Sequence, residues 1–342
     1  MSDVAGVILF ASVVLYGVFG GADFGAGLWD LTAGGAARGR RTRALVDHAI
    51  GPVWEANHVW LIFCLVVLWT AFPHAFADIT TTLFVPLGLA AIGIVLRGSG
   101  FAFRKVLVRT SERRLSGAAF ALSSVITPFF LGTIAGAVAS GRVPGGTTAW
   151  VNPTSMLGGA MAVAVCAYLA AVFLTAEAEI RNETDLQEAF RRRSIAASAV
   201  AGVLALVGIA VLHADAHRLF HRLLGPGLPF VVVSAAAGSA SLLLSGRCGP
   251  RGLRLLAVTA VGAVLVGWGV AQYPDLLGTH LTLAQAAAPS ATLWTVLIVF
   301  LAAAVLCVPS LAFLYTLQQR GRLEEFAPSG DRIPSSPDRG AG

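Results

Sequence analysis

Nine long apolar segments constrain this chain more than any other feature of its sequence. They cover residues 4–22, 53–72, 78–96, 117–139, 155–176, 194–213, 228–244, 255–272 and 291–316. A helix needs about 20 mainly apolar residues to cross the hydrocarbon core of a bilayer. Only 12% of the residues are charged, about half the share that is usual in soluble domains. The sequence therefore predicts an all-α, polytopic membrane protein with nine transmembrane helices.

The basic residues predict how such helices are oriented. If the segments alternate in direction, 21 of the 24 Lys and Arg residues fall in loops and a C-terminal tail on one side of the membrane. Only Arg142, Arg218 and Arg222 fall on the other side. Cytoplasmic loops carry an excess of Lys and Arg, so we expect the N-terminus outside and the C-terminus in the cytoplasm. The net charge of +6 then reports orientation, and no nucleic-acid partner is predicted.

The ends of the chain and the cysteines add three expectations. Residues 1–325 are expected to form one transmembrane domain, and the Pro-, Ser- and Gly-rich residues 326–342 a disordered cytoplasmic tail. No cleavable signal is expected, because the first five residues contain an acid and no basic residue. The four cysteines form no CxxC pair, which argues against a disulfide framework and against a structural zinc site.

Two carboxylates beside apolar segments are the main candidates for function. Asp23 follows the first segment in FGGADFGAGLWD, and Glu55 begins the second in GPVWEANHVW. Antiparallel helices would place both near the cytoplasmic face, with Asn57 and His58 close by; Glu55 and His58 would share a helix face. Charged groups in spans are costly and commonly functional, and such a set can exchange protons. Alternatively, Asp23 and Glu55 cap helix ends at the membrane interface; their positions favour neither reading.

Histidines offer little support for a metal or haem site in this chain. His213, His217 and His221 are spaced by four residues, so on one helix they would form a stripe that could bind a metal. The favoured interpretation is an amphipathic turn at the membrane interface, without a metal. The haem-attachment motif CxxCH is absent, and apart from His213, the last residue of the sixth segment, His58 is the one histidine within an apolar segment. Haems of any redox complex that contains this chain are therefore expected in another subunit.

Two motifs, and several stretches after them, resemble one known family. FGGADFGAGLWDL and, about thirty residues later, IGPVWEANHVWLIF are similar to the GFDxG and GPxWDGNxVWL motifs of subunit II of cytochrome bd-type quinol oxidases. The similarity continues through AFPHAFA, LFVPLGLAAIGIVLRG, TAEAEIRNETDLQEAFRRRS, YPDLL and LTLAQAAAPSATLW. It thus extends in order over nearly the whole chain.

The resemblance implies a subunit of a respiratory complex in the bacterial cytoplasmic membrane. In that family, subunit II packs beside a haem-bearing subunit I, which holds two haems b and a haem d (or a third haem b). The complex oxidises quinol near the outer face and reduces oxygen to water with cytoplasmic protons. Charge is thereby separated without proton pumping. Subunit II stabilises subunit I, and in some members it lines a proton route or holds a structural quinone. Whether a small accessory subunit is present stays open.

The resemblance also assigns roles to individual positions. Asp23 and Glu55 fall on the two family acids, which are proton-route candidates together with Asn57 and His58. Five other motif residues are expected to be structural: Gly25, Gly51, Pro52, Trp54 and Trp60. The chain departs from the family pattern at Ala22, Ala56 and His58, and it has Glu in place of Asp at position 55. These departures indicate a divergent branch.

Two other functions compete with the oxidase interpretation. Asp23 and Glu55 could couple protons to a solute in a secondary transporter. The absence of a recognisable internal repeat or of a matching pair of broken helices counts against this function. The chain could also be a purely scaffolding membrane subunit whose carboxylates take no part in chemistry.

Overall fold

The computed structural model describes all residues except 36, 52–53, 107–109 and 320–342, so the predicted disordered tail, 326–342, lies outside the described residues. In chain order, the elements are α1 (Ser2–Leu15), η1 (Tyr16–Gly20), α2 (Gly21–Leu31), α3 (Arg40–Ile50), α4 (Trp54–Asn57), α5 (Val59–Ala71), α6 (Pro73–Thr82), α7 (Phe84–Val106), α8 (Thr110–Ala139), α9 (Pro153–Ile180), α10 (Thr184–Asp215), α11 (His217–Leu224), α12 (Leu228–Leu243), α13 (Pro250–Gln272), β1 (Asp275–Leu277), β2 (Leu281–Thr282), α14 (Leu283–Ala286) and α15 (Ser290–Gln319).

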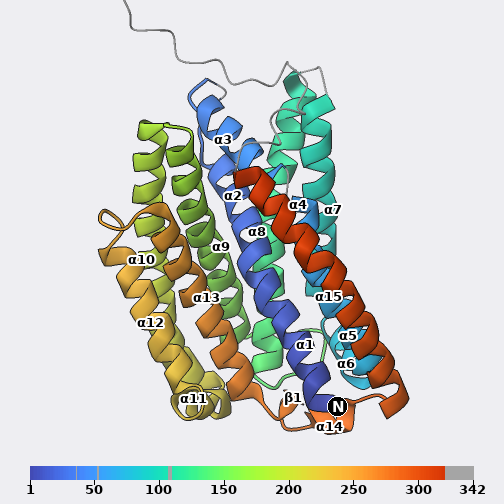
Figure 1. The fold of residues 1–342 in the computed structure, drawn as a ribbon. Coiled ribbons are helices and arrows are strands. Elements are labelled where there is room, and N and C mark those ends of the chain that lie inside the picture. Colours follow the sequence, from blue (N-terminus) through green and yellow to red (C-terminus); the bar gives the residue numbers. More distant parts are fainter. Residues whose placement is uncertain (36, 52–53, 107–109, 320–342) are drawn as a thin grey trace, which may run out of the picture.

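Long apolar helices form an elongated bundle (Figure 1), which confirms the prediction of an all-α membrane protein. Seven helices of the described chain are long and apolar enough to cross a membrane. Two sharply bent helix pairs bring the number to nine if each pair counts as one span. Helices α8, α9, α10, α13 and α15 each contain one of the predicted segments whole.

The predicted boundaries of the first and third segments are wrong, for identifiable reasons, whereas the second segment, 53–72, ends within one residue of the end of α5. The first helix does not end near residue 22 but continues to Leu31. The chain bends by 115° between α5 and α6, where Phe72 leaves the helical conformation and Pro73 begins the next helix. Proline lacks the N–H that would continue the preceding helix. The third long helix therefore begins at Phe84, not at residue 78.

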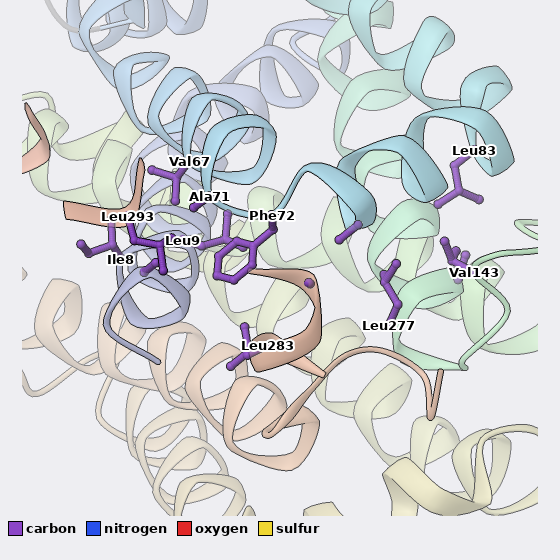
Figure 2. Close-up of a cluster of buried hydrophobic side chains, with 14 residues drawn as sticks. Ile8, Leu9, Val67, Ala71, Phe72, Leu83, Val143, Leu277, Leu283 and Leu293 are labelled. Atoms are coloured by element: carbon purple, nitrogen blue, oxygen red, sulfur yellow. The ribbon is translucent and has the colours of Figure 1, made fainter. Parts of the chain in front are cut away.

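The bend is held in place by a hydrophobic cluster at the end of the bundle that carries the N-terminus (Figure 2). Phe72 has no exposed surface and packs among Ile8 and Leu9 of α1, Leu283 of α14 and Leu293 of α15. Burial of one such side chain contributes about 1.5–3 kcal/mol. The cluster thus joins the first, second and last long helices of the chain.

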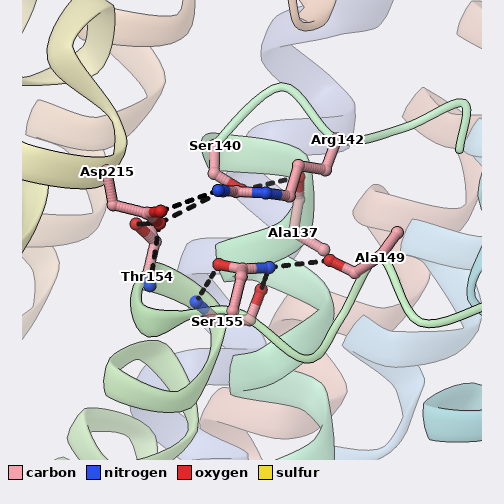
Figure 3. A network of polar contacts seen from close by, with 8 residues as sticks. Ala137, Ser140, Arg142, Ala149, Thr154, Ser155 and Asp215 are labelled. Carbon is pink, nitrogen blue, oxygen red and sulfur yellow. Dashed lines mark hydrogen bonds and ion pairs between the residues drawn. The ribbon is translucent and has the colours of Figure 1, made fainter.

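Ion pairs bind neighbouring segments at the same end of the bundle (Figure 3). The Asp215 carboxylate, at the end of α10, accepts hydrogen bonds from both Arg142 Nη atoms, at 2.7 and 3.1 Å. It also accepts from Oγ1 and the backbone N of Thr154, at 2.5 and 3.2 Å. Arg218 and Arg222 of α11 both pair with Asp275 of β1. The three arginines predicted outside thus serve as ties between loops and helix ends.

The predicted cytoplasmic loops lie toward the opposite end of the bundle. The α9–α10 turn and α3 lie away from the N-terminus, whereas α11, β1 and α14 lie close to it (Figure 1). This arrangement agrees with the alternating helix directions that were assumed when 21 of the 24 basic residues were assigned to one side of the membrane. Which end faces the cytoplasm stays a prediction from the arginines.

Candidate functional site

The first long helix changes its winding just before the candidate carboxylate. η1 is a π-helical turn that joins α1 to α2 without a break. Turns of this kind hold one extra residue and occur frequently at functional sites. Asp23 follows in the first turn of α2, inside a continuous helix. The expectation that Asp23 closes the helix is therefore wrong.

Glycines after Asp23 let α2 approach two neighbouring helices closely. A Cβ atom on Gly25 would lie 1.8 Å from the backbone oxygen of Cys166 on α9, and one on Gly27 would lie 2.1 Å from Ser124 Oγ on α8. Small residues permit this close packing between helices in membranes. Gly25 of the first motif thus has a packing role, and the packing fixes where Asp23 lies.

The Asp23 side chain is buried and hydrogen-bonded. It is 8% exposed, and Asn57 is 3% exposed. Asn57 Nδ2 donates to Asp23 Oδ2 over 2.6 Å, and lies 3.5 Å from the Phe19 carbonyl oxygen. The amide at the end of α4 is thereby fixed to the first helix. Asp23 and Asn57, predicted to lie near each other, are in direct contact.

Arg97 of α7 completes this contact, and the sequence analysis missed it by counting it among the loop arginines. Its side chain is 1% exposed. Nη2 donates to the Asp23 backbone oxygen over 2.9 Å, and Nη1 donates to Ser124 Oγ over 2.5 Å. The guanidinium carbon lies 4.7 Å and 4.9 Å from the ring centres of Phe24 and Phe120. Cation–π contact and hydrogen bonds together offset part of the cost of burying this charge.

A phenol and an imidazole lie beside this pair. Tyr16, in the π-helical turn, forms a hydrogen bond of 3.3 Å between its hydroxyl and His58 Nδ1. The Phe24 ring lies 6.3 Å from the Tyr16 ring and 6.1 Å from the His58 ring. The charge of Arg97 acts electrostatically on Asp23, Tyr16 and His58. We call Tyr16, Asp23, Asn57, His58 and Arg97 the Asp23 centre.

Glu55 is placed differently from the other proton-route candidates. Its side chain is exposed at the start of the chain's second long segment, in the short helix α4. Between α4 and α5 the backbone of His58 stays helical, and its N–H donates to the Glu55 carbonyl oxygen over 3.2 Å. No hydrogen bond or ion pair of the Glu55 side chain is found among the described residues. The structure thus brings Asn57 to Asp23 and His58 to Tyr16, while Glu55 lies at the surface.

The remaining motif residues lie around the start of the second long segment. Gly51 ends α3, and its N–H donates to the Asp47 carbonyl oxygen over 2.9 Å. Pro52 lies outside the described residues, and α4 begins at Trp54. Trp60 is buried and packs against the Phe63 ring. Gly51 and Trp60 thus occupy positions consistent with a structural role.

The three outer histidines are close together but do not lie on one helix. The chain breaks at Ala216, between His213 on α10 and the pair His217 and His221 on α11. Their rings are still neighbours, with centres 4.9 Å and 4.6 Å apart, and His217 Nδ1 donates to the His213 carbonyl oxygen. Across the described residues, no group of three or more His, Cys, Asp or Glu side chains is arranged to hold a metal ion.

The Asp23 centre can hold protons in a place that water reaches poorly. A carboxyl, a phenol and an imidazole each bind and release a proton, whereas a guanidinium stays charged. Ionisable groups at such depth are expensive, and they commonly mark ion or proton pathways. Chemically, the centre can store a charge at Asp23 that Arg97 compensates.

A comparison with protein families identifies the chain. Residues 1–318 match the profile of the cytochrome bd terminal oxidase subunit II family. The chain belongs to this family. The resemblance predicted from the two motifs is therefore confirmed, as is a multi-pass membrane protein.

Individual members of the subunit II family are distant relatives. The chain is similar to cytochrome bd ubiquinol oxidase subunit 2 of Bacillus subtilis, with 26% identity over 225 residues. This match covers 63% of the chain and 64% of that relative, just under two thirds of its length. A putative cytochrome bd menaquinol oxidase subunit II from the same organism is 20% identical over 92% of the chain and 94% of that protein.

Similarity in three dimensions covers almost the whole molecule. The bd oxidase structure from Geobacillus thermodenitrificans contains a chain that matches with a TM-score of 0.75 at 21% identity. The match covers 96% of this chain and 99% of the other. It shows that this chain shares its fold with a chain of that structure.

Proposed function

We propose that this chain is the haem-free subunit II of a bd-type quinol oxidase and packs against a haem-bearing subunit I. Subunit I would hold two haems b with a haem d or a third haem b. The complex would oxidise quinol, reduce oxygen to water, and separate charge across the membrane without pumping protons. Family membership over residues 1–318 supports this proposal, and the relatives in Bacillus subtilis are named as oxidase subunits.

Within that complex, we propose that the Asp23 centre passes protons toward the site of oxygen reduction. The observation that carries this proposal is a buried Asp23 carboxylate that accepts a hydrogen bond of 2.6 Å from Asn57, with the buried Arg97 guanidinium donating to the Asp23 backbone oxygen over 2.9 Å. A structural capping role would not require a second buried charge. Glu55 is exposed on α4, which lies toward the end of the bundle with the predicted cytoplasmic loops (Figure 1), and it would take up protons from solvent. His58 and Tyr16 would extend the hydrogen-bonded route.

The proton route is tested by replacing a carboxyl group with an amide, which has nearly the same shape but does not exchange a proton in this way. Asp23→Asn keeps a hydrogen-bonding group toward Asn57, so we expect the complex to assemble with normal haem content. Loss of a positioned proton-transfer group costs about a hundredfold or more in rate, and partial bypass by water makes about tenfold the smallest expected loss. Glu55→Gln is expected to slow turnover less, because water reaches that surface directly. The measurement is quinol-driven oxygen uptake per haem.

A matched control uses a carboxylate remote from the centre. Asp3 is exposed at the start of α1, and Asp3→Asn is expected to leave oxygen uptake unchanged. Normal turnover of both Asp23→Asn and Glu55→Gln would remove these carboxylates from the mechanism and favour the scaffolding role.

The oxidase role itself is tested by purification. A tagged chain extracted in mild detergent is expected to bring along a second subunit with haem absorption bands and quinol-driven oxygen uptake. The absorption of haem d at the red end of the spectrum would distinguish it from a third haem b. A colourless single chain, isolated from membranes in which the partner is expressed, would instead favour the transporter or scaffold.

A further inference from the structure

We propose that an anionic phospholipid binds at the corner where α10 meets the turn between α12 and α13, with its phosphate on Arg247 and Arg251 and its acyl chains along α10 and α12. This inference does not rest on the oxidase function. It rests on the arginines of this corner, on their missing acceptors and on the apolar surface below them.

Arginines at this corner differ from most others in the described chain. Elsewhere, six arginines pair with nearby carboxylates: Arg41, Arg43, Arg142, Arg181, Arg218 and Arg222. At the start of α10, Arg191 and Arg192 both pair with Glu188. Arg247 and Arg251 are exposed, and no ion pair of either is found within the described part of the chain. No Asp or Glu occurs between Asp215 and Asp275. The local sequence therefore supplies positive charge without a compensating acid.

Helix α10 adds further guanidinium groups to the corner. A Cβ atom on Gly246 would lie 3.3 Å from Arg191 Nη1, so the turn after α12 lies against the arginine-rich start of α10. Arg191 itself pairs with Glu188. Arg193 and Arg254 of the neighbouring turns stack on aromatic rings, and Arg254 Nη2 donates to the Phe173 carbonyl oxygen over 3.3 Å. Among the described residues, the corner arginines left without a carboxylate or ring partner are therefore Arg247 and Arg251, whose charge a phosphate would compensate.

An apolar surface continues from these arginines along the bundle. Leu243, the last residue of α12, is 74% exposed, and Leu255, one helical turn after Arg251 on α13, is 68% exposed. Val203 and Leu206 of α10 are 59% and 68% exposed. Aliphatic side chains this exposed on helices that cross a membrane need an apolar cover, which acyl chains provide wherever no partner subunit packs. A ligand with a charged end and long apolar chains matches both surfaces.

The charge pattern favours a phosphate-bearing lipid over other apolar ligands. Arginine binds phosphate through two parallel hydrogen bonds, and basic pockets between transmembrane helices bind anionic headgroups. Arg247 lies in the turn after α12, and Arg251 lies in the first turn of α13. If α12 and α13 cross the bilayer, such a turn would lie near the membrane surface, at the level of the lipid phosphates. A soluble phosphate compound has no apolar chains that could cover the exposed aliphatic surface.

The test measures lipid binding to the protein as purified from membranes, with any partner subunit attached. After delipidation, phosphatidylglycerol and phosphatidylcholine are titrated in detergent, and bound lipid is counted by native mass spectrometry. Each basic residue near an anionic lipid contributes about fivefold in affinity. The variant Arg247→Gln/Arg251→Gln is therefore expected to bind phosphatidylglycerol about thirtyfold more weakly than the unmodified protein. Arg247→Lys/Arg251→Lys should retain most of the affinity, since it keeps the charge.

The matched control removes the same charge elsewhere. Arg38 and Arg40 are exposed near the start of α3, and Arg38→Gln/Arg40→Gln should change the affinity less than threefold. Equal losses in both double variants would overturn the proposal in favour of unspecific surface charge. Unchanged binding in Arg247→Gln/Arg251→Gln would overturn it too. Full displacement of the lipid by millimolar inorganic phosphate would indicate a site for soluble anions instead.

Discussion

Arg97→Met is expected to destabilise the folded protein by about 3–5 kcal/mol. The side chain is 1% exposed and makes two hydrogen bonds, to Ser124 and to the Asp23 backbone. A hydrogen bond to a charged group contributes about 1.5–3 kcal/mol, and breaking one side of a buried charge pair costs about 3–5 kcal/mol. Methionine is shorter than arginine and has no guanidinium, so the cation–π contacts with Phe24 and Phe120 are lost as well. The loss therefore combines these contacts and hydrogen bonds with the missing charge beside the buried Asp23 carboxylate.

The double variant separates charge compensation from packing. If Asp23 is the group that Arg97 compensates, Arg97→Met/Asp23→Asn removes both charges together, and replacement of a buried pair by neutral groups is often nearly neutral. We expect the double variant to be destabilised by less than about 2 kcal/mol, whereas each single variant should be destabilised by at least that amount. The coupling between the two positions should then be at least about 2 kcal/mol.

The free energies can be measured by SDS titration of the purified protein in mixed micelles, with tryptophan fluorescence and haem absorbance as probes. Arg97→Lys is the control that keeps a positive charge, and it should lose less than Arg97→Met. A loss below about 1 kcal/mol in Arg97→Met, or a double variant equal to the sum of the singles, would refute the assignment of Arg97 as the partner of the Asp23 charge.

Two further changes test the packing of the bundle. Gly25→Ala would place a Cβ atom 1.8 Å from the Cys166 oxygen, so we expect a large fall in the yield of folded protein, whereas Gly88→Ala, with nothing within 4 Å, should have no effect; equal yields would contradict the close packing. Asp215→Asn should lower stability by about 1–2 kcal/mol, because the amide offers Arg142 one acceptor instead of two. An unchanged melting temperature would show that the ion pair contributes nothing.

The sequence predicted the long helices well because their signal is local. An apolar run of about 20 residues meets the requirement of a bilayer whatever it packs against. The second segment was predicted to end at residue 72, but the helix α6 after the bend was missed, since the hydropathy of AFPHAFA suits a loop as well as a helix. Only the burial of Phe72 among residues of α1, α14 and α15 stabilises a sharp turn there.

The candidate site was predicted in part. Asp23 and Asn57 were found because polar groups beside apolar runs stand out in the sequence. Arg97 was assigned to a loop, since an arginine at the end of an apolar run usually extends to the interface. It turns inward here because Ser124 and two aromatic rings receive it. Partners brought together from separate helices leave no mark in the local sequence.

The π-helical turn before Asp23 uncouples the length of the first helix from the direction of its side chains. Each residue of an α-helix advances the next by about 100°, so one residue absorbed between Tyr16 and Gly20 rotates everything after it by that angle. A one-residue insertion or deletion in this turn would therefore change the direction in which the later side chains point more than it would change the length of the helix. When divergent members of the family are aligned, a single-residue gap in this stretch would decide which side chain meets Asn57, and it should be placed by that contact.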